Sequence, residues 1–306
     1  MALRWRIPYT AGVIRRRPIA RRLAMLGMVF AAAGCSPPGI LDTLNSLTPG
    51  DSDAHRAATA VAYGPAPRQR LDVWTPRSNG IGLRPVVIFF YGGAWVKGSR
   101  GDYGFAGRAY AARGFVAVVP DYRLVPSVRF PAFVQDGALA IRWTRDHAAR
   151  FGGDPTRITI AGHSAGAYIG AMLALDPHYL TDIGVAPTTI RAAALLAGPY
   201  DFYPWDDSRA VDAFADWPRP EETQPIHYAR ADAPPMWLAA GTADTTVKPR
   251  NSVALADRLK AFGAPVRLRE YPGKSHVDLV MGLSKPFRGR VPTLDDSTAF
   301  LMAHSR

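Results

Sequence analysis

The chain has 306 residues, of which 48% are hydrophobic and 20% charged, as is typical of globular proteins. Its single cysteine excludes an intrachain disulfide, a Cys-rich zinc site and a Cys-x-x-Cys redox motif, so a nucleophile is expected among the hydroxyl groups. The formal net charge of +12 raises the question of nucleic acid binding, which depends on where the basic residues lie.

The excess positive charge belongs to the N-terminal segment. The chain from Cys35 onward carries an excess of only +5, so no nucleic acid partner is expected. The apolar run of residues 23–34 has the length of a signal-peptide h-region and is too short to span a bilayer comfortably. Residues 1–34 are therefore predicted to be an export signal. The basic residues before Cys35, with no acidic residue among them, are Arg4, Arg6, Arg15, Arg16, Arg17, Arg21 and Arg22.

The end of this segment, Ala32-Ala33-Gly34-Cys35, resembles the lipobox of bacterial lipoproteins, in which cleavage precedes a cysteine that receives lipid. The resemblance implies lipid attachment at Cys35 and a lipid-anchored place in the bacterial cell envelope, or a periplasmic place without the lipid. The residue after the cysteine is Ser36 and not Asp, which favours the outer membrane as the place of the anchor. The alternative interpretation is that Cys35 is a buried residue at the start of an ordinary domain.

Residues 35–62 are rich in Pro, Gly, Ser, Thr and Asp and are predicted to be a tether or N-terminal segment. From residue 63 to 306, short apolar runs alternate with longer segments of helical spacing, which predicts one α/β domain. Runs that are apolar throughout indicate burial on both faces, hence a mostly parallel sheet with helices on both sides. The expected strands are residues 71–75, 86–90, 115–119, 158–161, 192–197, 236–240 and 266–271. The expected helices are residues 103–113, 131–150, 165–175, 250–262 and 293–303.

Residues 199–235 interrupt this alternation. They carry Trp205 and Trp217 among acidic residues and prolines, and they are longer than a usual connection. One interpretation is a lid or substrate wall over the carboxyl ends of the strands. The other is a surface excursion whose aromatic side chains fill a satellite core.

An apolar strand runs into Gly162-His163-Ser164-Ala165-Gly166 and then into a helix rich in small residues. This strand, turn and helix are the context of a nucleophile elbow, in which the serine sits in a strained backbone at a tight turn. Glycines are required there because a Cβ at either flank would clash with the neighbouring strand or helix. A helix N-cap is the simpler interpretation of Ser164, and the elbow places the residue at a helix start as well.

A serine hydroxyl needs a histidine base and a carboxylate that orients it. Asp244 follows the expected strand 236–240, and His276 follows the expected strand 266–271. In chain order the serine, aspartate and histidine match one known arrangement of such triads. In isolation, Asp244 is more simply a loop-capping residue and His276 a surface residue. Their positions at strand ends favour catalysis.

Acyl transfer also needs backbone N–H donors for a tetrahedral oxyanion. The expected strand 86–90 ends in Tyr91-Gly92-Gly93-Ala94-Trp95, where two positions lack side chains and the main chain can approach a substrate closely. A plain type II turn is the simpler interpretation, but it does not explain the position of this loop one βα unit before Ser164.

These motifs resemble the α/β-hydrolase superfamily, and within it the esterases of the hormone-sensitive-lipase-like and arylformamidase-like (BD-FAE) groups. The resemblance spans about residue 71 to the C-terminus and includes Asp121-Tyr122-Arg123-Leu124 and Phe151-Gly152-Gly153-Asp154-Pro155. It implies the α/β-hydrolase fold, with a mostly parallel central sheet of about eight strands and helices on both faces. Tyr91 stands where the family usually has a histidine that supports the loop.

The resemblance also implies roles for individual residues. Ser164 is implied as nucleophile, His276 as general base and Asp244 as the residue that orients it. The N–H groups of Gly93, Ala94 and Ala165 are implied as oxyanion donors, with Gly92 as the alternative second donor of the loop. Asp121, Tyr122 and Arg123 are expected to be structural.

The expected activity is hydrolysis of a small-molecule carboxylic ester of modest acyl length through an acyl-enzyme. A formamidase or amidase uses the same triad, and a catalytically silent hydrolase fold used for binding is the alternative from another class. No cofactor is expected, and the seven histidines form no His-Glu-x-x-His motif, so no metal is expected either. The motifs do not specify the oligomeric state.

Overall fold

The computed structural model describes residue 1 and residues 50–78 and 82–306. The expected export signal, the lipid site at Cys35 and residues 36–49 of the expected tether lie outside the described residues. Contacts divide the chain into residues 1–37 and residues 38–306, and the fold described below belongs to the second unit. Within the described residues, no helix combines the length and the apolar character needed to cross a membrane.

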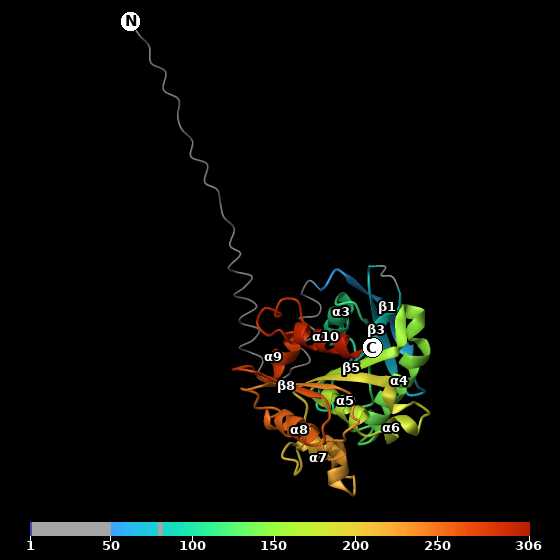
Figure 1. Ribbon diagram of the computed structural model, residues 1–306, viewed down its shortest axis with the longest axis vertical. Helices are drawn as coiled ribbons and strands as arrows, with labels where there is room; N and C mark the ends of the chain where they lie inside the picture. The colour runs from blue at the N-terminus through green and yellow to red at the C-terminus, as the bar shows by residue number, and fades with distance from the viewer. Residues whose placement is uncertain (2–49, 79–81) are drawn as a thin grey trace. The chain divides into compact units, whose positions relative to one another are not determined.

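Eight strands form one sheet in the spatial order β1-β2-β4-β3-β5-β6-β7-β8 (Figure 1). β1 pairs with β2 and β2 with β4 in antiparallel fashion, and the remaining neighbours are parallel. The predicted sheet of about eight mostly parallel strands is therefore confirmed. The strands are β1 Ala54–Ala62, β2 Arg70–Pro76, β3 Arg84–Phe90, β4 Val116–Pro120, β5 Gly153–His163, β6 Ile190–Leu196, β7 Met236–Gly241 and β8 Val266–Tyr271.

The central strands are buried because both of their faces are covered. All residues of β4 and β7 are buried, as are the last six residues of β3, and this is why their sequences read as continuous apolar runs. On one face, α3 (Gly104–Ala112) packs against α10 (Thr293–His304). On the other, α4 (Ala132–His147) packs against α5 (Ala165–Leu175), with α8 (Arg250–Ala261) against β7 and β8 (Figure 1). Shorter helices are α6 His178–Thr181, α7 Ser208–Phe214 and α9 His276–Met281.

The first strand was not expected from the sequence. β1 covers Ala54–Ala62 within the segment predicted to be a tether, so the sheet begins before residue 63. β1 is an edge strand that is mostly exposed or half-buried, and its register with β2 shifts twice. An alanine-rich edge strand buries little apolar surface, so it lacks the hydrophobic pattern by which the other seven strands were predicted.

The long connection of residues 199–235 folds into α7 and two short 3₁₀ helices, Pro220–Thr223 and Pro225–Tyr228. Its aromatic side chains form a cluster around Trp95 that contains Phe202, Trp205, Phe214 and Trp217. The rings of Trp95 and Phe214 meet edge to face at a centroid distance of 4.8 Å, and those of Phe130 and Trp217 at 5.0 Å. Phe214 belongs to the main hydrophobic core, and Trp205 and Trp217 pack against it, so these side chains extend that core to the loop that follows β3 rather than form the separate satellite core that one interpretation predicted.

The strand order places a switch point beside β3. From β3 the chain moves outward to β4 and then crosses back to β5 on the other side of β3. Ligands of open α/β sheets bind at the carboxyl ends of strands where the connections diverge in this way. The loops after β3 and β5 therefore occupy the position at which such a fold forms a site.

Buried ionic contacts fasten α4 to the loop after β4. Asp136 on α4 is fully buried and accepts hydrogen bonds from the Arg123 side chain, the Arg123 backbone N–H and Gln69. Asp136→Ala leaves the buried Gln69 amide without its acceptor and the Arg123 guanidinium, whose side chain is 31% exposed, without its partner, so the free energy of unfolding should fall by about 3 kcal/mol. Urea unfolding of the chain from Ser36 onward measures this loss.

The control is Asp146→Ala, because Asp146 pairs with Arg145 at the surface of the same helix. An exposed pair contributes about 1 kcal/mol or less. If both variants lost the same free energy of unfolding, the Asp136 contacts would contribute no more to stability than a surface ion pair.

Candidate active site

Ser164 lies at the junction between β5 and α5. β5 ends at His163 and α5 begins at Ala165, so Ser164 alone makes the turn, with φ 55° and ψ −123°. A positive φ is strained for a residue with a Cβ and persists only where the surrounding structure enforces it. The strained turn that the motif predicts is therefore present in the backbone of this residue.

The two glycines of the motif are required by close approach of main chain to main chain. A Cβ at Gly166 would lie 2.1 Å from the carbonyl oxygen of Phe90, and a Cβ at Gly162 would lie 2.6 Å from that of Gly166. Both distances are far below van der Waals contact. The elbow can therefore pack against the end of β3 only if both positions lack side chains.

The hydroxyl group of Ser164 does not cap the helix. Ser164 occupies the N-cap position of α5, yet its side chain makes no capping hydrogen bond. Ala165 is the first residue of α5, and the N–H at that position has no intrahelical carbonyl acceptor. The simpler N-cap interpretation therefore holds for the position of Ser164 and fails for its hydroxyl group.

Asp244 and His276 are brought together from two loops. The Nδ1 atom of His276 lies 2.7 Å from Oδ2 of Asp244, and the side chains are 11% and 1% exposed. Because a carboxylate only accepts, Nδ1 carries a proton, and in the neutral form of the imidazole the lone pair is then on Nε2. The other oxygen of Asp244 accepts the N–H groups of Thr246 and Val247, each at 2.9 Å, which fixes the plane of the carboxylate.

Backbone contacts hold the two loops in register. The N–H of Ala243 donates to the carbonyl of Lys274 at 3.0 Å, and a Cβ at Gly241 would lie 2.2 Å from that same oxygen. His276 is the first residue of α9. Asp278 accepts from both the backbone N–H and the hydroxyl of Ser275, and this capping interaction fixes the start of the helix. The spacing Ser275-x-x-Asp278 is a sequence signal for this cap that the sequence interpretation did not use.

The glycine loop after β3 passes directly over the elbow. A Cβ at Gly92 would lie 3.0 Å from the Cβ of Ser164, and one at Gly93 would lie 2.1 Å from the carbonyl of Lys97. Gly93 has φ +142°, and Ala94 and Trp95 have φ 50° and 61°. The carbonyl of Gly93 accepts the N–H groups of Val96 and Lys97, which closes the turn. The loop is therefore a strained main-chain segment next to the serine.

Tyr91, at the position where the family usually has a histidine, is fully buried and its hydroxyl group is hydrogen-bonded. It donates to Asp121, while the hydroxyl of Tyr122 donates to the backbone carbonyl of Tyr91. Arg123 binds Asp136 on α4. The three residues expected to be structural therefore make structural contacts, and two of them support the glycine loop.

His163 lies inside the Gly162–Gly166 motif, and the structure shows that it contacts His276. Its Nε2 lies 3.1 Å from the backbone carbonyl of His276, and the ring centroids are 4.7 Å apart. Since a carbonyl only accepts, Nε2 of His163 carries the proton, and its Nδ1 is buried without a hydrogen-bond partner among the described residues. Burial, and the like charge that His276 would carry, lower the pKa of His163 well below its ordinary value.

Among the described residues, no group of three or more His, Cys, Asp and Glu side chains is arranged to hold a metal ion. The carboxyl edge of the sheet carries a serine at the elbow, a histidine bound to a carboxylate, and the main chain of the glycine loop. Nucleophilic attack on a carbonyl group, followed by proton transfer, uses groups of these kinds.

The BD-FAE family model matches residues 71–259 of the chain. Esterase LipC of Mycobacterium tuberculosis is 34% identical over 244 residues, a match that covers 72% of this chain and 60% of LipC. Isoprenylcysteine alpha-carbonyl methylesterase ICME of Arabidopsis thaliana is 32% identical over 259 residues, covering 78% of this chain and 60% of ICME. The chain thus spans about three fifths of the length of these relatives.

Solved structures agree with the fold. The apo form of Thermogutta terrifontis esterase 2 superposes with a TM-score of 0.68 at 27% identity, covering 83% of this chain and 96% of that one. A carbohydrate esterase from gut microbiota, at 21% identity, has a TM-score of 0.72 and shares the fold. The expected fold class is therefore confirmed from both sequence and structure.

The buried imidazole of His163 predicts a pH dependence of stability. In the unfolded chain this group takes up a proton near pH 6.5, so below about that pH the unfolded state binds more protons than the folded state. The free energy of unfolding should then fall by up to about 1.4 kcal/mol per pH unit on acidification, until the depressed pKa of the folded state is reached. His163→Gln, which keeps a donor for the carbonyl of His276, should remove this component.

The measurement is urea unfolding between about pH 7 and pH 5. The exposed His227 supplies the matched control His227→Gln, which should retain the wild-type pH slope. If His163→Gln kept the same slope as the control, the imidazole of His163 would not be held neutral by the fold.

Proposed function

Because the chain belongs to the BD-FAE family, we propose that it is a serine hydrolase that cleaves carboxylic esters through an acyl-enzyme. The observation that carries the proposal is the His276–Asp244 hydrogen bond at the same edge of the sheet as the strained Ser164 elbow. A histidine held in one tautomer by a buried carboxylate is the form of imidazole that can remove a proton from a serine hydroxyl group. The esterases among the relatives support the same activity.

The reaction follows from the roles of these groups. The Oγ of Ser164 attacks the ester carbonyl while Nε2 of His276 takes the hydroxyl proton. The carbonyl oxygen becomes negative and is bound by backbone N–H groups of Gly93 and Ala94 in the loop and of Ala165 at the start of α5. When the tetrahedral intermediate collapses, His276 returns the proton to the leaving alcohol. A water molecule, deprotonated by His276, then releases the acid from Ser164.

An ester is proposed as the substrate class, with an acyl group of modest length. Structures of Thermogutta terrifontis esterase 2 are described as butyrate bound and propionate bound, which supports a short acyl group for that enzyme. In this chain the aromatic cluster around Trp95 adjoins the glycine loop, so an apolar wall stands next to the proposed oxyanion donors. The amidase alternative differs in the leaving group, and a formamide substrate tests it directly.

Substitution of the proposed nucleophile tests the mechanism. Ser164→Ala should lower kcat on p-nitrophenyl esters by about 10⁴-fold or more, because the covalent step is lost, and Asp244→Asn should lower it by about 10⁴-fold through the wrong tautomer of His276. The measurement is hydrolysis of an acyl series from acetyl to palmitoyl, with N-formylkynurenine alongside. Ser305→Ala is the control and should retain wild-type turnover, because its hydroxyl group contacts Arg157 in the first half of β5, away from the elbow at the end of that strand.

Covalent labelling provides a second readout. A fluorophosphonate should label Ser164 in the wild-type chain and leave Ser164→Ala unlabelled, in line with the description of Thermogutta terrifontis esterase 2 as phosphonylated by sarin. A folded wild-type chain that neither labels nor hydrolyses any of these substrates would contradict the hydrolase proposal and favour a silent fold used for binding. A preference for the formamide would move the assignment to the amidase branch.

We also propose that the protein is exported and anchored by lipid at Cys35, with the hydrolase domain outside the cytoplasm. The support is the sequence alone: the arginine-rich start, the apolar run and the Gly34-Cys35 junction. Cys35→Ala should abolish incorporation of labelled fatty acid in bacterial cells and leave an unprocessed or soluble product. Lipid labelling that persists in Cys35→Ala would contradict the anchor.

A further inference from the structure

Four residues in the loop of residues 91–98 have positive φ angles, and two of these four residues have a Cβ. Gly93 and Gly98 have φ +142° and +102°, and Ala94 and Trp95, which have a Cβ, lie in the left-handed region. Left-handed backbone is strained for a residue that has a Cβ. Inside the loop, the carbonyl of Gly93 accepts two N–H groups, from Val96 and Lys97. Contacts from outside the loop must therefore stabilise its shape.

Arg68 contacts both ends of this loop. Its Nη2 atom lies 2.8 Å from the hydroxyl oxygen of Tyr91 and 2.8 Å from the carbonyl oxygen of Gly98. Its Nε donates to the carbonyl of Tyr122 at 2.9 Å, and the hydroxyl of Tyr122 donates to the carbonyl of Tyr91 at 2.9 Å. The guanidinium group of Arg68 therefore binds both the first and the last residue of the loop. It also binds Tyr122, which in turn binds Tyr91.

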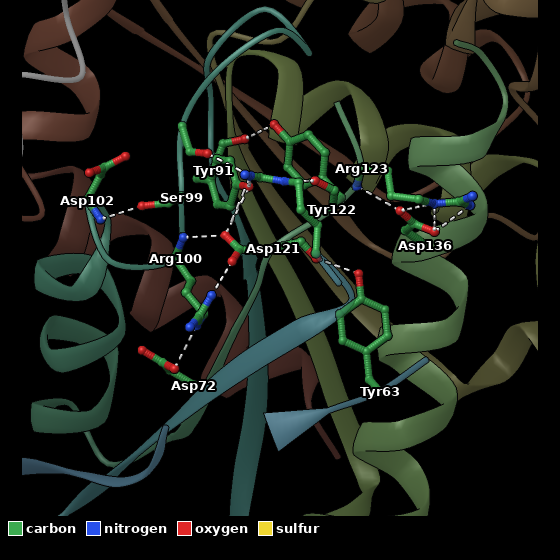
Figure 2. Close-up of polar contacts among 12 residues, drawn as sticks. Tyr63, Asp72, Tyr91, Ser99, Arg100, Asp102, Asp121, Tyr122, Arg123 and Asp136 are labelled. Carbon is green, nitrogen blue, oxygen red and sulfur yellow. Dashed lines mark hydrogen bonds and ion pairs between the residues drawn. The ribbon is translucent and has the colours of Figure 1, made fainter. Parts of the chain in front are cut away.

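On its other side the Tyr91 hydroxyl group meets a buried carboxylate. It donates to Oδ1 of Asp121 at 3.1 Å, and the same oxygen accepts the N–H of Arg100 at 2.6 Å (Figure 2). The Arg100 side chain binds Asp121 and also reaches Oδ1 of Asp72 on β2 at 2.9 Å. Asp121 directly follows β4. The hydroxyl group of Tyr91 thus links the end of β3 to the end of β4 and, through Arg100, to β2.

The hydroxyl group of Tyr91 accepts one hydrogen bond and donates another. It accepts from Arg68 and donates to Asp121, so the two charged groups are joined through a neutral O–H. Burial and the neighbouring Asp121 raise the pKa of Tyr91 well above its ordinary value, which keeps the proton on the oxygen. The ring is stacked between Tyr103 and Tyr122 at centroid distances of 5.5 Å and 4.6 Å, which fixes its direction.

We propose that Tyr91 is a positioning residue for the oxyanion site, its hydroxyl group setting the loop of residues 91–98 through Arg68 and Asp121. The proposal rests on the proposed esterase function and adds to it the group that holds the donors in place. Tyr91 does not contact the substrate in this scheme. Nη2 of Arg68 and Oδ1 of Asp121 lie 3.8 Å apart, and the hydroxyl oxygen of Tyr91 contacts both. An imidazole at position 91 is shorter than the phenol, so its nitrogen atoms end short of the place of this oxygen, and the residue usual in the family is not equivalent in this chain.

The test removes the hydroxyl group and keeps the stacked ring. Tyr91→Phe should lower kcat for a p-nitrophenyl ester by about tenfold to a hundredfold, less than loss of a complete oxyanion donor, with KM within about twofold. Its Ki for a trifluoromethyl ketone, whose serine adduct carries an oxyanion, should rise by the same factor as kcat/KM falls. Tyr91→His should not restore activity.

The control is Tyr110→Phe, because Tyr110 is also a fully buried tyrosine with one hydrogen-bonded hydroxyl group, to Ser297 at 3.1 Å on α10. It should retain kcat and Ki within about twofold. Rates are divided by the fraction of sites that react with a fluorophosphonate, so partial unfolding of a variant does not count as a catalytic effect. A Tyr91→Phe variant with lower thermal stability but wild-type kcat per reactive site and wild-type Ki would overturn the proposal.

A double-mutant cycle tests whether Arg68 and Tyr91 act together. Arg68→Met removes the bonds to both ends of the loop, so adding Tyr91→Phe to it should lower kcat by about twofold or less. Effects that multiply would show two independent contacts and would contradict a shared role. The failure of the esterase function itself has a different signature, because the wild-type chain would then neither label nor hydrolyse the ester.

Discussion

Close approach of main chain to main chain at the carboxyl edge of the sheet is the constraint on which the candidate site depends. The elbow meets the end of β3 at Gly166, and the loop of Asp244 meets the loop of His276 at Gly241. At both positions an added Cβ would lie 2.1–2.2 Å from a carbonyl oxygen. Side chains cannot fill these junctions, so the strands that carry the proposed catalytic groups are spaced by their backbones. Positions set in this way are stiff, which the proposed acyl transfer would require.

The strain in the site is balanced by a buried ionic network behind it. Ser164, Ala94 and Trp95 have positive φ, and each of these conformations needs support from its surroundings. Asp121 and Asp72, which are nearly fully buried, bind Arg100, and Asp121 also binds the hydroxyl of Tyr91. Buried carboxylates are tolerated when paired and hydrogen-bonded in this way, and their removal leaves donors without acceptors. The same contacts therefore hold the glycine loop of the candidate site and join the ends of β3 and β4 to β2.

Most of the sheet and the three proposed catalytic positions could be predicted, because their signals are local. Seven strands are apolar runs, and Gly162-His163-Ser164-Ala165-Gly166 carries the requirement for a tight turn in its own spacing. β1 lacked such a signal because it is an edge strand with little buried surface. The contact of His163 with the carbonyl of His276 joins residues 113 apart in sequence, and no spacing rule connects them.

The sequence by itself determined the α/β class and the glycines at the turns, since these follow from hydrophobic pattern and local sterics. The assignment of serine, aspartate and histidine in that chain order followed from the resemblance to the α/β-hydrolase superfamily. Only the tertiary structure decided that Tyr91 can stand where the family usually has a histidine. That outcome depends on Arg68 and Asp121, which come from different strand ends and meet at one hydroxyl group. A hydrogen bond is decided by distance and direction in space, and these exist only after the sheet has assembled.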